Sequence, residues 1–131
     1  MSPNKSVLVV DDDTAIRGVM RTILRREGFE VEDVASGNDA IALLNDKPYD
    51  AVVLEVMMGD GSGHDVLDAL AAMRPAVRCV VVVSAASPAD IEKVDESNVR
   101  AKLRKPFDIT ALVEAIRGCF DGKDGLPSEV V

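Results

Sequence analysis

Six side chains that can bind cations or phosphate follow four of the segments that we expect to be strands. They are Asp11, Asp12, Asp13, Glu55, Ser84 and Lys105. Carboxylate oxygens are the ligands that a hard cation such as Mg²⁺ prefers. A serine hydroxyl and a lysine ammonium are suited to hold the oxygens of a phosphoryl group. The pattern favours magnesium-dependent phosphate chemistry, provided that the fold brings the four positions together.

Each of these residues has an ordinary explanation when it is taken singly. Asp13 stands where a helix N-cap is expected. A serine after a strand, or a lysine before a proline, is common in loops. The combination is more informative, because open parallel sheets bind ligands beyond the carboxyl ends of their strands. We therefore interpret the four strand ends as one site, and Asp13 as the cap of the helix that follows.

Strand-like and helix-like segments alternate five times along the chain. The expected strands are 7–10, 29–34, 51–54, 80–83 and 99–103. The expected helices are 14–27, a segment capped by Ser36 and ended by Lys47-Pro48, a segment after Gly63, one that starts at Ser87, and 108–120. In the first of these helices the apolar repeat consists of Ile16, Val19, Met20, Ile23 and Leu24. Such alternation predicts an α/β fold with a doubly wound, five-stranded parallel sheet.

The composition excludes several classes of protein. With 131 residues the chain has the size of one domain, and we expect residues 1–120 to form it and 121–131 to be a flexible tail or a truncated linker. The net charge of −8 and the aromatic content of 3% argue against direct nucleic-acid binding. We see no signal peptide and no apolar run of membrane-spanning length, so we expect no membrane contact and a cytoplasmic location. In that compartment Cys79 and Cys119 are expected to be reduced.

From residue 5 to about 120, the sequence resembles the receiver domain of bacterial two-component response regulators. Four segments carry the family's motifs in the family's order: 7–17 (VLVVDDDTAIR), 54–58 (LEVMM), 83–85 (VSA) and 105–107 (KPF). The resemblance implies a flavodoxin-like, CheY-like fold with strand order 2-1-3-4-5 and five helices on both faces. It also implies phosphorelay signal transduction through protein contacts, not enzymatic turnover.

The resemblance also implies roles for single residues. Asp12 would be the direct Mg²⁺ ligand, Asp11 would assist through water, and the main-chain carbonyl of Met57 would be a further ligand. Ser84 and Lys105 would contact the attached phosphoryl group. The implied partners are a histidine kinase or phosphotransfer protein, or a downstream effector. A homodimer would form through the face made by the fourth helix, the fifth strand and the fifth helix.

Glu55 stands at the position where the family accepts phosphate on an aspartate. Its carboxylate lies one carbon–carbon bond, about 1.5 Å, farther from the main chain. A misplacement near 1 Å can cost roughly a hundredfold in a positioned reaction, so efficient phosphorylation is not expected. The same displacement weakens the expected Mg²⁺ site. Two interpretations remain: Glu55 is phosphomimetic and approaches Lys105 and Ser84, or it abolishes switching and leaves a binding module.

The last expected strand departs from the family as well. Lys102 replaces the aromatic residue whose rotation reports phosphorylation. Together with Arg100 and Arg104 it forms a basic stripe along an edge of the sheet. The stripe either protects the edge against aggregation or docks an acidic partner.

The loop after Glu55 is rich in glycine and differs from the family at two further points. Gly59 stands where the family favours proline, and Ser62 stands where it favours aspartate. Glycines in such a loop increase its conformational freedom. Asp60 is either a substitute ligand or acceptor, or a solvated loop residue.

A haloacid dehalogenase-type magnesium-dependent phosphatase is the alternative from another class. Its first motif fits 10–14, with Asp11 as nucleophile and Asp13 as general acid, and Ser84 and Lys105 fit its later motifs. That family needs a further acidic pair after the lysine, where only one helix and the tail follow. A flavin-binding module is disfavoured because the three aspartates would repel its phosphate. We therefore expect a chain that is not an enzyme.

Overall fold

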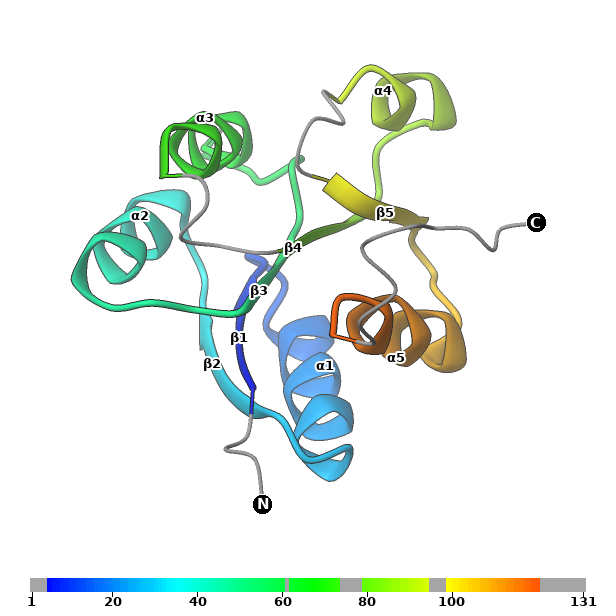
Figure 1. Ribbon diagram of the computed structural model, residues 1–131. Helices are drawn as coiled ribbons and strands as arrows, with labels where there is room; N and C mark the ends of the chain where they lie inside the picture. The colour runs from blue at the N-terminus through cyan, green and yellow to red at the C-terminus, as the bar shows by residue number, and fades with distance from the viewer. Residues whose placement is uncertain (1–4, 61, 74–78, 95–98, 121–131) are drawn as a thin grey trace.

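The computed structural model contains one five-stranded parallel sheet with strand order β2-β1-β3-β4-β5. It describes residues 5–60, 62–73, 79–94 and 99–120. The strands are β1 (Ser6–Val10), β2 (Glu30–Val34), β3 (Ala51–Leu54), β4 (Cys79–Ser84) and β5 (Val99–Arg104) (Figure 1). This order and the parallel pairing confirm the predicted doubly wound α/β fold.

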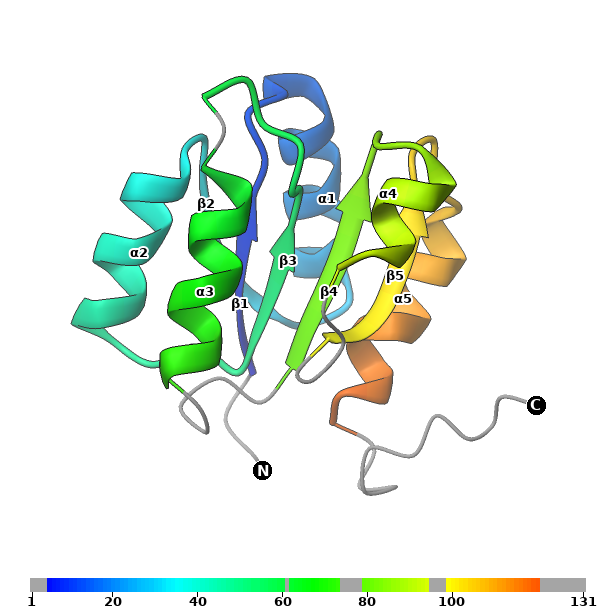
Figure 2. The ribbon, with the colours of Figure 1, turned by 90° about the horizontal axis from the view of Figure 1, so that it is seen from above.

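Helices cover both faces of the sheet. They are α1 (Thr14–Arg26), α2 (Gly37–Asp46), α3 (Gly63–Met73), α4 (Pro88–Glu92) and α5 (Ile109–Gly118). Helices α1 and α5 lie on one face, and α2, α3 and α4 lie on the other (Figures 1 and 2). The prediction of five helices on both faces is confirmed.

The central strands are buried on both faces, which explains their continuous apolar runs. In β1, the side chains of Leu8 and Val10 pack in the core layer on the side of α2 and α3. Val7 and Val9 pack in the layer on the side of α1 and α5. Strands β3 and β4 alternate in the same way. Because apolar side chains fill both faces of β1, β3 and β4, polar side chains are found in these described strands only at their ends.

Side-chain caps fix where the helices begin. Asp13 accepts a hydrogen bond from the Ile16 N–H over 3.0 Å, so its interpretation as an N-cap is confirmed. Ser36 and Ser87 cap α2 and α4 in the same manner. Gly28, which follows α1, has a φ of 96°, a conformation that a residue with a side chain rarely adopts. These local signals were readable in the sequence.

One member of the apolar repeat in α1 does not join the core. Val19 is 49% exposed, whereas Met20 and Leu24 are fully buried. The repeat marked an apolar face wider than the surface that the sheet covers, and Val19 lies at its edge. With Ile109, Val19 lines a surface groove of about 520 Å³.

The expectation of two reduced cysteines is wrong in this structure. Cys79, the first residue of β4, and Cys119, which follows α5, form a disulfide with a Cα–Cα distance of 5.8 Å. The two residues are 40 positions apart, and no spacing motif announces the pair. They meet because α5 packs back along the sheet, so the end of α5 comes beside the start of β4.

Two further expectations concern membrane-spanning segments and the end of the chain. Among the described residues, the structure has no helix with the length and apolar character needed to cross a membrane. The expected tail or linker, 121–131, lies outside the described residues.

Candidate functional site

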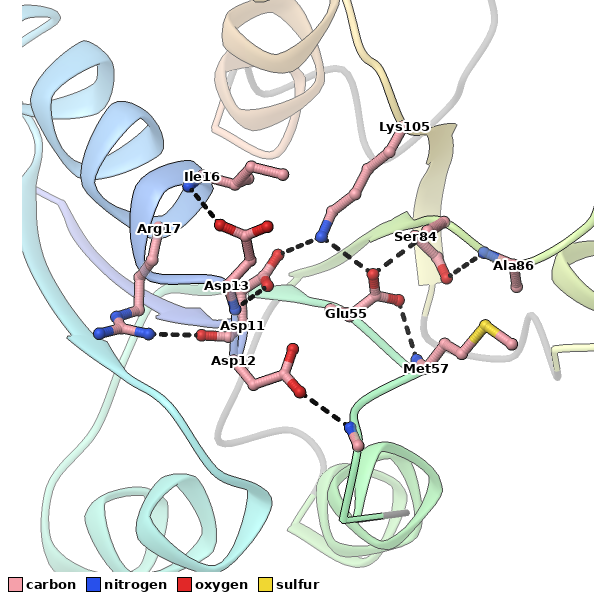
Figure 3. A network of polar contacts seen from close by, with 12 residues as sticks. Asp11, Asp12, Asp13, Ile16, Arg17, Glu55, Met57, Ser84, Ala86 and Lys105 are labelled. Carbon is pink, nitrogen blue, oxygen red and sulfur yellow. Dashed lines mark hydrogen bonds and ion pairs between the residues drawn. The ribbon is translucent and has the colours of Figure 1, made fainter.

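The carboxyl ends of the strands bring the predicted residues to one edge of the sheet. Asp11 follows β1, Glu55 follows β3, Ser84 ends β4 and Lys105 follows β5 (Figure 3). Asp11 and Ser84 are fully buried, and Glu55 is 2% exposed. Buried polar groups need partners, and the partners of each group define what the pocket can do.

Lys105 lies between the two buried carboxylates. Its Nζ atom is 2.7 Å from Asp11 Oδ2 and 3.0 Å from Glu55 Oε1, and its side chain is 11% exposed. Both contacts are ion pairs. One ammonium group thus serves two carboxylates (Figure 3).

Burial and charge act in opposite directions on these groups. Burial raises the pKa of the Asp11 carboxyl above its usual value of 3.8, although the contact with Lys105 lowers it. Burial lowers the pKa of Lys105, but its contacts with Asp11 and Glu55 outweigh burial and raise it above 10.5. Lys105 therefore stays charged at neutral pH.

Both oxygens of Glu55 are engaged. Oε2 accepts a hydrogen bond from the main-chain N–H of Met57 over 2.8 Å. Oε1 accepts from the N–H of Ala85 over 3.1 Å and also contacts Lys105. Hydrogen bonds to an ionised acceptor are stronger than those between neutral groups. The Glu55 carboxylate is therefore held by donors from three segments of the chain.

Ser84 and Met57 lie beside the carboxylate in less direct ways. Ser84 Oγ accepts a hydrogen bond from the Ala86 N–H over 3.0 Å. The contact from the end of β4 to Glu55 is made by the main chain of Ala85. The Met57 side chain is 58% exposed, and its N–H is the group that faces Glu55.

The other predicted acids turn toward main-chain donors. Asp12 is exposed, and its Oδ2 accepts from the Gly59 N–H over 2.8 Å. Asp11 Oδ1 accepts from the Asp13 N–H over 2.9 Å. Asp60 accepts from both the N–H and the hydroxyl of Ser62, at 3.0 and 2.6 Å, so it stabilises the turn before α3 and not the pocket.

The two acids among the predicted Mg²⁺ ligands, Asp11 and Asp12, contact groups of the protein itself in this arrangement. Within residues 5–60, 62–73, 79–94 and 99–120, no three acidic, histidine or cysteine side chains are grouped so that they could hold a metal ion. Asp11 Oδ2 is buried without a hydrogen bond, which would suit a cation, but Lys105 already contacts it. As arranged, the side chains do not fit Mg²⁺.

A supporting network behind the pocket was missed in the sequence. Arg17 donates to the main-chain oxygen of Asp11 and to Asp33 Oδ2, both over 2.8 Å. Arg21 donates to Asp33 Oδ1 over 3.0 Å. Burial opposes the charge on Asp33, but the bonds from Arg21 and Arg17 outweigh it and lower its pKa. The sequence signal was weak, because Arg17 and Asp33 are 16 residues apart on different elements.

Lys102, in the predicted basic stripe, reaches the end of α4. Its Nζ atom donates to the main-chain oxygens of Val94 over 3.0 Å and Glu92 over 3.4 Å. A cation at this position complements the partial negative charge of a helix C-terminus. The side chain thus ties β5 to α4.

Comparison with known proteins gives one consistent result. The family model for the response regulator receiver domain matches residues 7–117. The acid tolerance regulatory protein ActR of Sinorhizobium medicae is 31% identical over 116 residues, which cover 88% of this chain and 60% of the relative. The chain thus spans less than two thirds of that relative's length.

Solved structures agree with this match. The receiver domain protein (CheY-like) from Methanospirillum hungatei aligns with a TM-score of 0.79 and 28% identity, covering 88% of this chain and 92% of the other. TrrA from Thermotoga maritima, solved in complex with Mg²⁺ and BeF, aligns with a TM-score of 0.78 and 23% identity over 88% and 98%. The second likeness bears on the fold alone.

Proposed function

Since this chain belongs to the response regulator receiver domain family, we propose that it is a receiver module in which Glu55 stands in for a phosphorylated aspartate. The observation that carries the proposal is the set of donors around the Glu55 carboxylate. Lys105, the Met57 N–H and the Ala85 N–H all contact it, at 2.8–3.1 Å. An acidic group is therefore already seated among the donors of the pocket.

Side-chain length supports this assignment. A glutamate carries its carboxylate about 1.5 Å farther than an aspartate does. The extra length lets the carboxylate reach the donors of Ala85 and Lys105, which follow β4 and β5, whereas an aspartate would approach them only with a group attached to it. A carboxylate supplies a charge of −1, against about −1.5 to −2 for a phosphoryl group. The Glu55 carboxylate therefore reproduces the position of the phosphoryl group better than it reproduces its charge.

The module acts through protein contacts and does not turn over a substrate. Its proposed partners are a histidine kinase or phosphotransfer protein, or a downstream effector. The proposed homodimer face is α4–β5–α5, where the basic stripe of Arg100, Lys102 and Arg104 lies on β5. We place this activity in the cytoplasm, without direct nucleic-acid contact. Residues 1–120 form the receiver module, and 121–131 are its tail or linker.

The phosphatase alternative gains no support from the described residues. Asp13, its expected general acid, is the N-cap of α1 and accepts from the Ile16 N–H. Asp11, its expected nucleophile, is fully buried in contact with Lys105.

Intact mass after incubation with Mg²⁺ and acetyl phosphate tests the proposal. The unmodified chain is expected to stay unmodified, whereas Glu55→Asp is expected to gain a labile phosphoryl group. Phosphorylation of the unmodified chain would show that another acceptor exists and that Glu55 does not hold the switch. If neither protein reacts, the pocket has lost its phosphorylation chemistry beyond the change at residue 55, and a pure interaction module becomes the better assignment.

Oligomeric state distinguishes imitation from simple loss of switching. Sedimentation of the unmodified chain should match that of phosphorylated Glu55→Asp and differ from that of the unphosphorylated variant. A match between the unmodified chain and the unphosphorylated variant would contradict imitation.

A further inference from the structure

Gly59 and Asp12 join two loops of the pocket through one hydrogen bond. The main-chain N–H of Gly59, between β3 and α3, donates to Asp12 Oδ2 over 2.8 Å, across 47 positions of sequence. We propose that this bond commits the Asp12 carboxylate to the loop after β3, so that the acidic pocket is complete without Mg²⁺ and binds the ion weakly. The inference rests on the proposed receiver function only for the identity of the metal.

Two N–H groups of one loop connect acids from two strands. The Met57 N–H bonds Glu55, which follows β3, and the Gly59 N–H bonds Asp12, which follows β1. A divalent cation would connect neighbouring carboxylates because one oxygen of each would coordinate it. Here the loop makes the connection with hydrogen-bond donors, both over 2.8 Å.

Lys105 completes the replacement at the buried end of the pocket. Its ammonium lies within 3.0 Å of both Asp11 Oδ2 and Glu55 Oε1. Each of the three acids that could ligate a metal therefore contacts a donor of the protein itself. Asp12 is the exposed member of the three, so its bond to Gly59 is the one that an incoming cation meets first.

The bond needs the N–H of residue 59 and not the absence of a side chain. A Cβ atom added to Gly59 would lie 3.5 Å from Asp12 Oδ2, which is ordinary contact, and Gly59 does not have a positive φ. Alanine at this position therefore fits and keeps the donor. Proline removes the donor, because its main-chain nitrogen carries no hydrogen.

Mg²⁺ titration of Gly59→Pro, Gly59→Ala and the unmodified chain by calorimetry tests the inference. Loss of a charge-assisted hydrogen bond predicts that Gly59→Pro binds Mg²⁺ about tenfold more tightly, which corresponds to about 1.4 kcal/mol. Gly59→Ala should bind like the unmodified chain. Equal affinities in all three proteins, with cooperative unfolding of each, would overturn the inference.

A second measurement on the unmodified chain keeps the test independent of how Gly59→Pro folds. The Gly59 amide is followed by NMR while Mg²⁺ is added. Saturation should shift this amide and remove its protection from hydrogen exchange, because the ion takes the Asp12 oxygen. A bound ion that leaves the Gly59 amide unchanged would refute the competition. Failure of the proposed function appears instead in the phosphorylation of Glu55→Asp, which these titrations do not involve.

Discussion

Replacing Lys105 with methionine tests how the pocket tolerates its buried acids. Methionine has a similar length and no charge, so the change removes the ammonium and keeps much of the packing. Asp11 and Glu55, which are 0% and 2% exposed, then face each other without the cation between them. Glu55 keeps its bonds from the Met57 and Ala85 N–H groups. Asp11 Oδ2 loses its ion-pair partner.

Removing one partner of a buried ion pair costs roughly 3–5 kcal/mol in free energy of unfolding. The retained bonds of Glu55 and proton uptake by Asp11 favour the lower end, about 3 kcal/mol at pH 7. Without Lys105, the folded-state pKa of Asp11 rises further above its unfolded value. Stability tied to a raised carboxyl pKa is present at low pH and is lost as the pH rises through the folded pKa. The deficit of the variant should therefore shrink on acidification.

Urea denaturation followed by circular dichroism at pH 7 and pH 5 measures both effects. With a slope of about 1–3 kcal/mol per molar urea, the midpoint should fall by roughly 1–3 M at pH 7. In the double variant Asp11→Asn, Lys105→Met, only one of the two buried carboxylates remains, so part of the lost stability should be recovered. A loss below about 1 kcal/mol at pH 7, or a deficit as large at pH 5, would refute the role given to Lys105.

Three further predictions address the surroundings of the pocket and the fold. Asp33→Asn should lower the free energy of unfolding by about 1.5–3 kcal/mol at pH 7. Because the Arg21 and Arg17 bonds lower the Asp33 pKa below 3.8, this difference should persist above pH 4 and vanish as the pH falls below that value, in urea denaturation from pH 7 to 3. The Cys79–Cys119 disulfide closes a loop of 40 residues. Reducing it should lower the free energy of unfolding by up to about 4 kcal/mol, measured by urea denaturation with and without reductant. The stability of Cys119→Ser should not change when the reductant is added. Tyr49→Phe removes a hydrogen bond to Glu32 that is the leading cause of the lowered Glu32 pKa, so NMR titration should show that pKa rise, with a loss of about 1 kcal/mol in stability.

The fold was predictable because burial leaves two different apolar patterns in the sequence, one in the strands and one in the helices. The central strands are apolar on both faces and therefore read as short continuous apolar runs, whereas the helices repeat apolar residues at helical spacing. The two patterns alternate along the chain, so strands and helices are easily told apart. Caps such as Asp13 and Ser87 then located the helix starts. The exposure of Val19 was not predicted, because an apolar repeat shows which residues can be buried and not how much of the helix the sheet covers.

The members of the pocket were predictable, but their partners were not. Topology alone places the ends of β1, β3, β4 and β5 at one edge, which assembles Asp11, Glu55 and Lys105. The donors to Glu55 and Asp12 are main-chain N–H groups, which every residue but proline possesses. No residue type announces which of them will be used. The Cys79–Cys119 pair was missed for a related reason, since its contact depends on how α5 packs.

The pocket attracts cations while its ligands are committed elsewhere. Asp11, Asp12 and Glu55 carry up to three negative charges against the one positive charge of Lys105, so the local field remains negative. Field alone does not build a metal site, because a small divalent ion also needs oxygens that converge on it. The N–H groups of Met57 and Gly59 each bind one oxygen of two of these acids, Glu55 and Asp12. On the inference drawn above, weak Mg²⁺ binding depends on how the main-chain N–H groups of Met57 and Gly59 hold Glu55 and Asp12, and not on the number of acids.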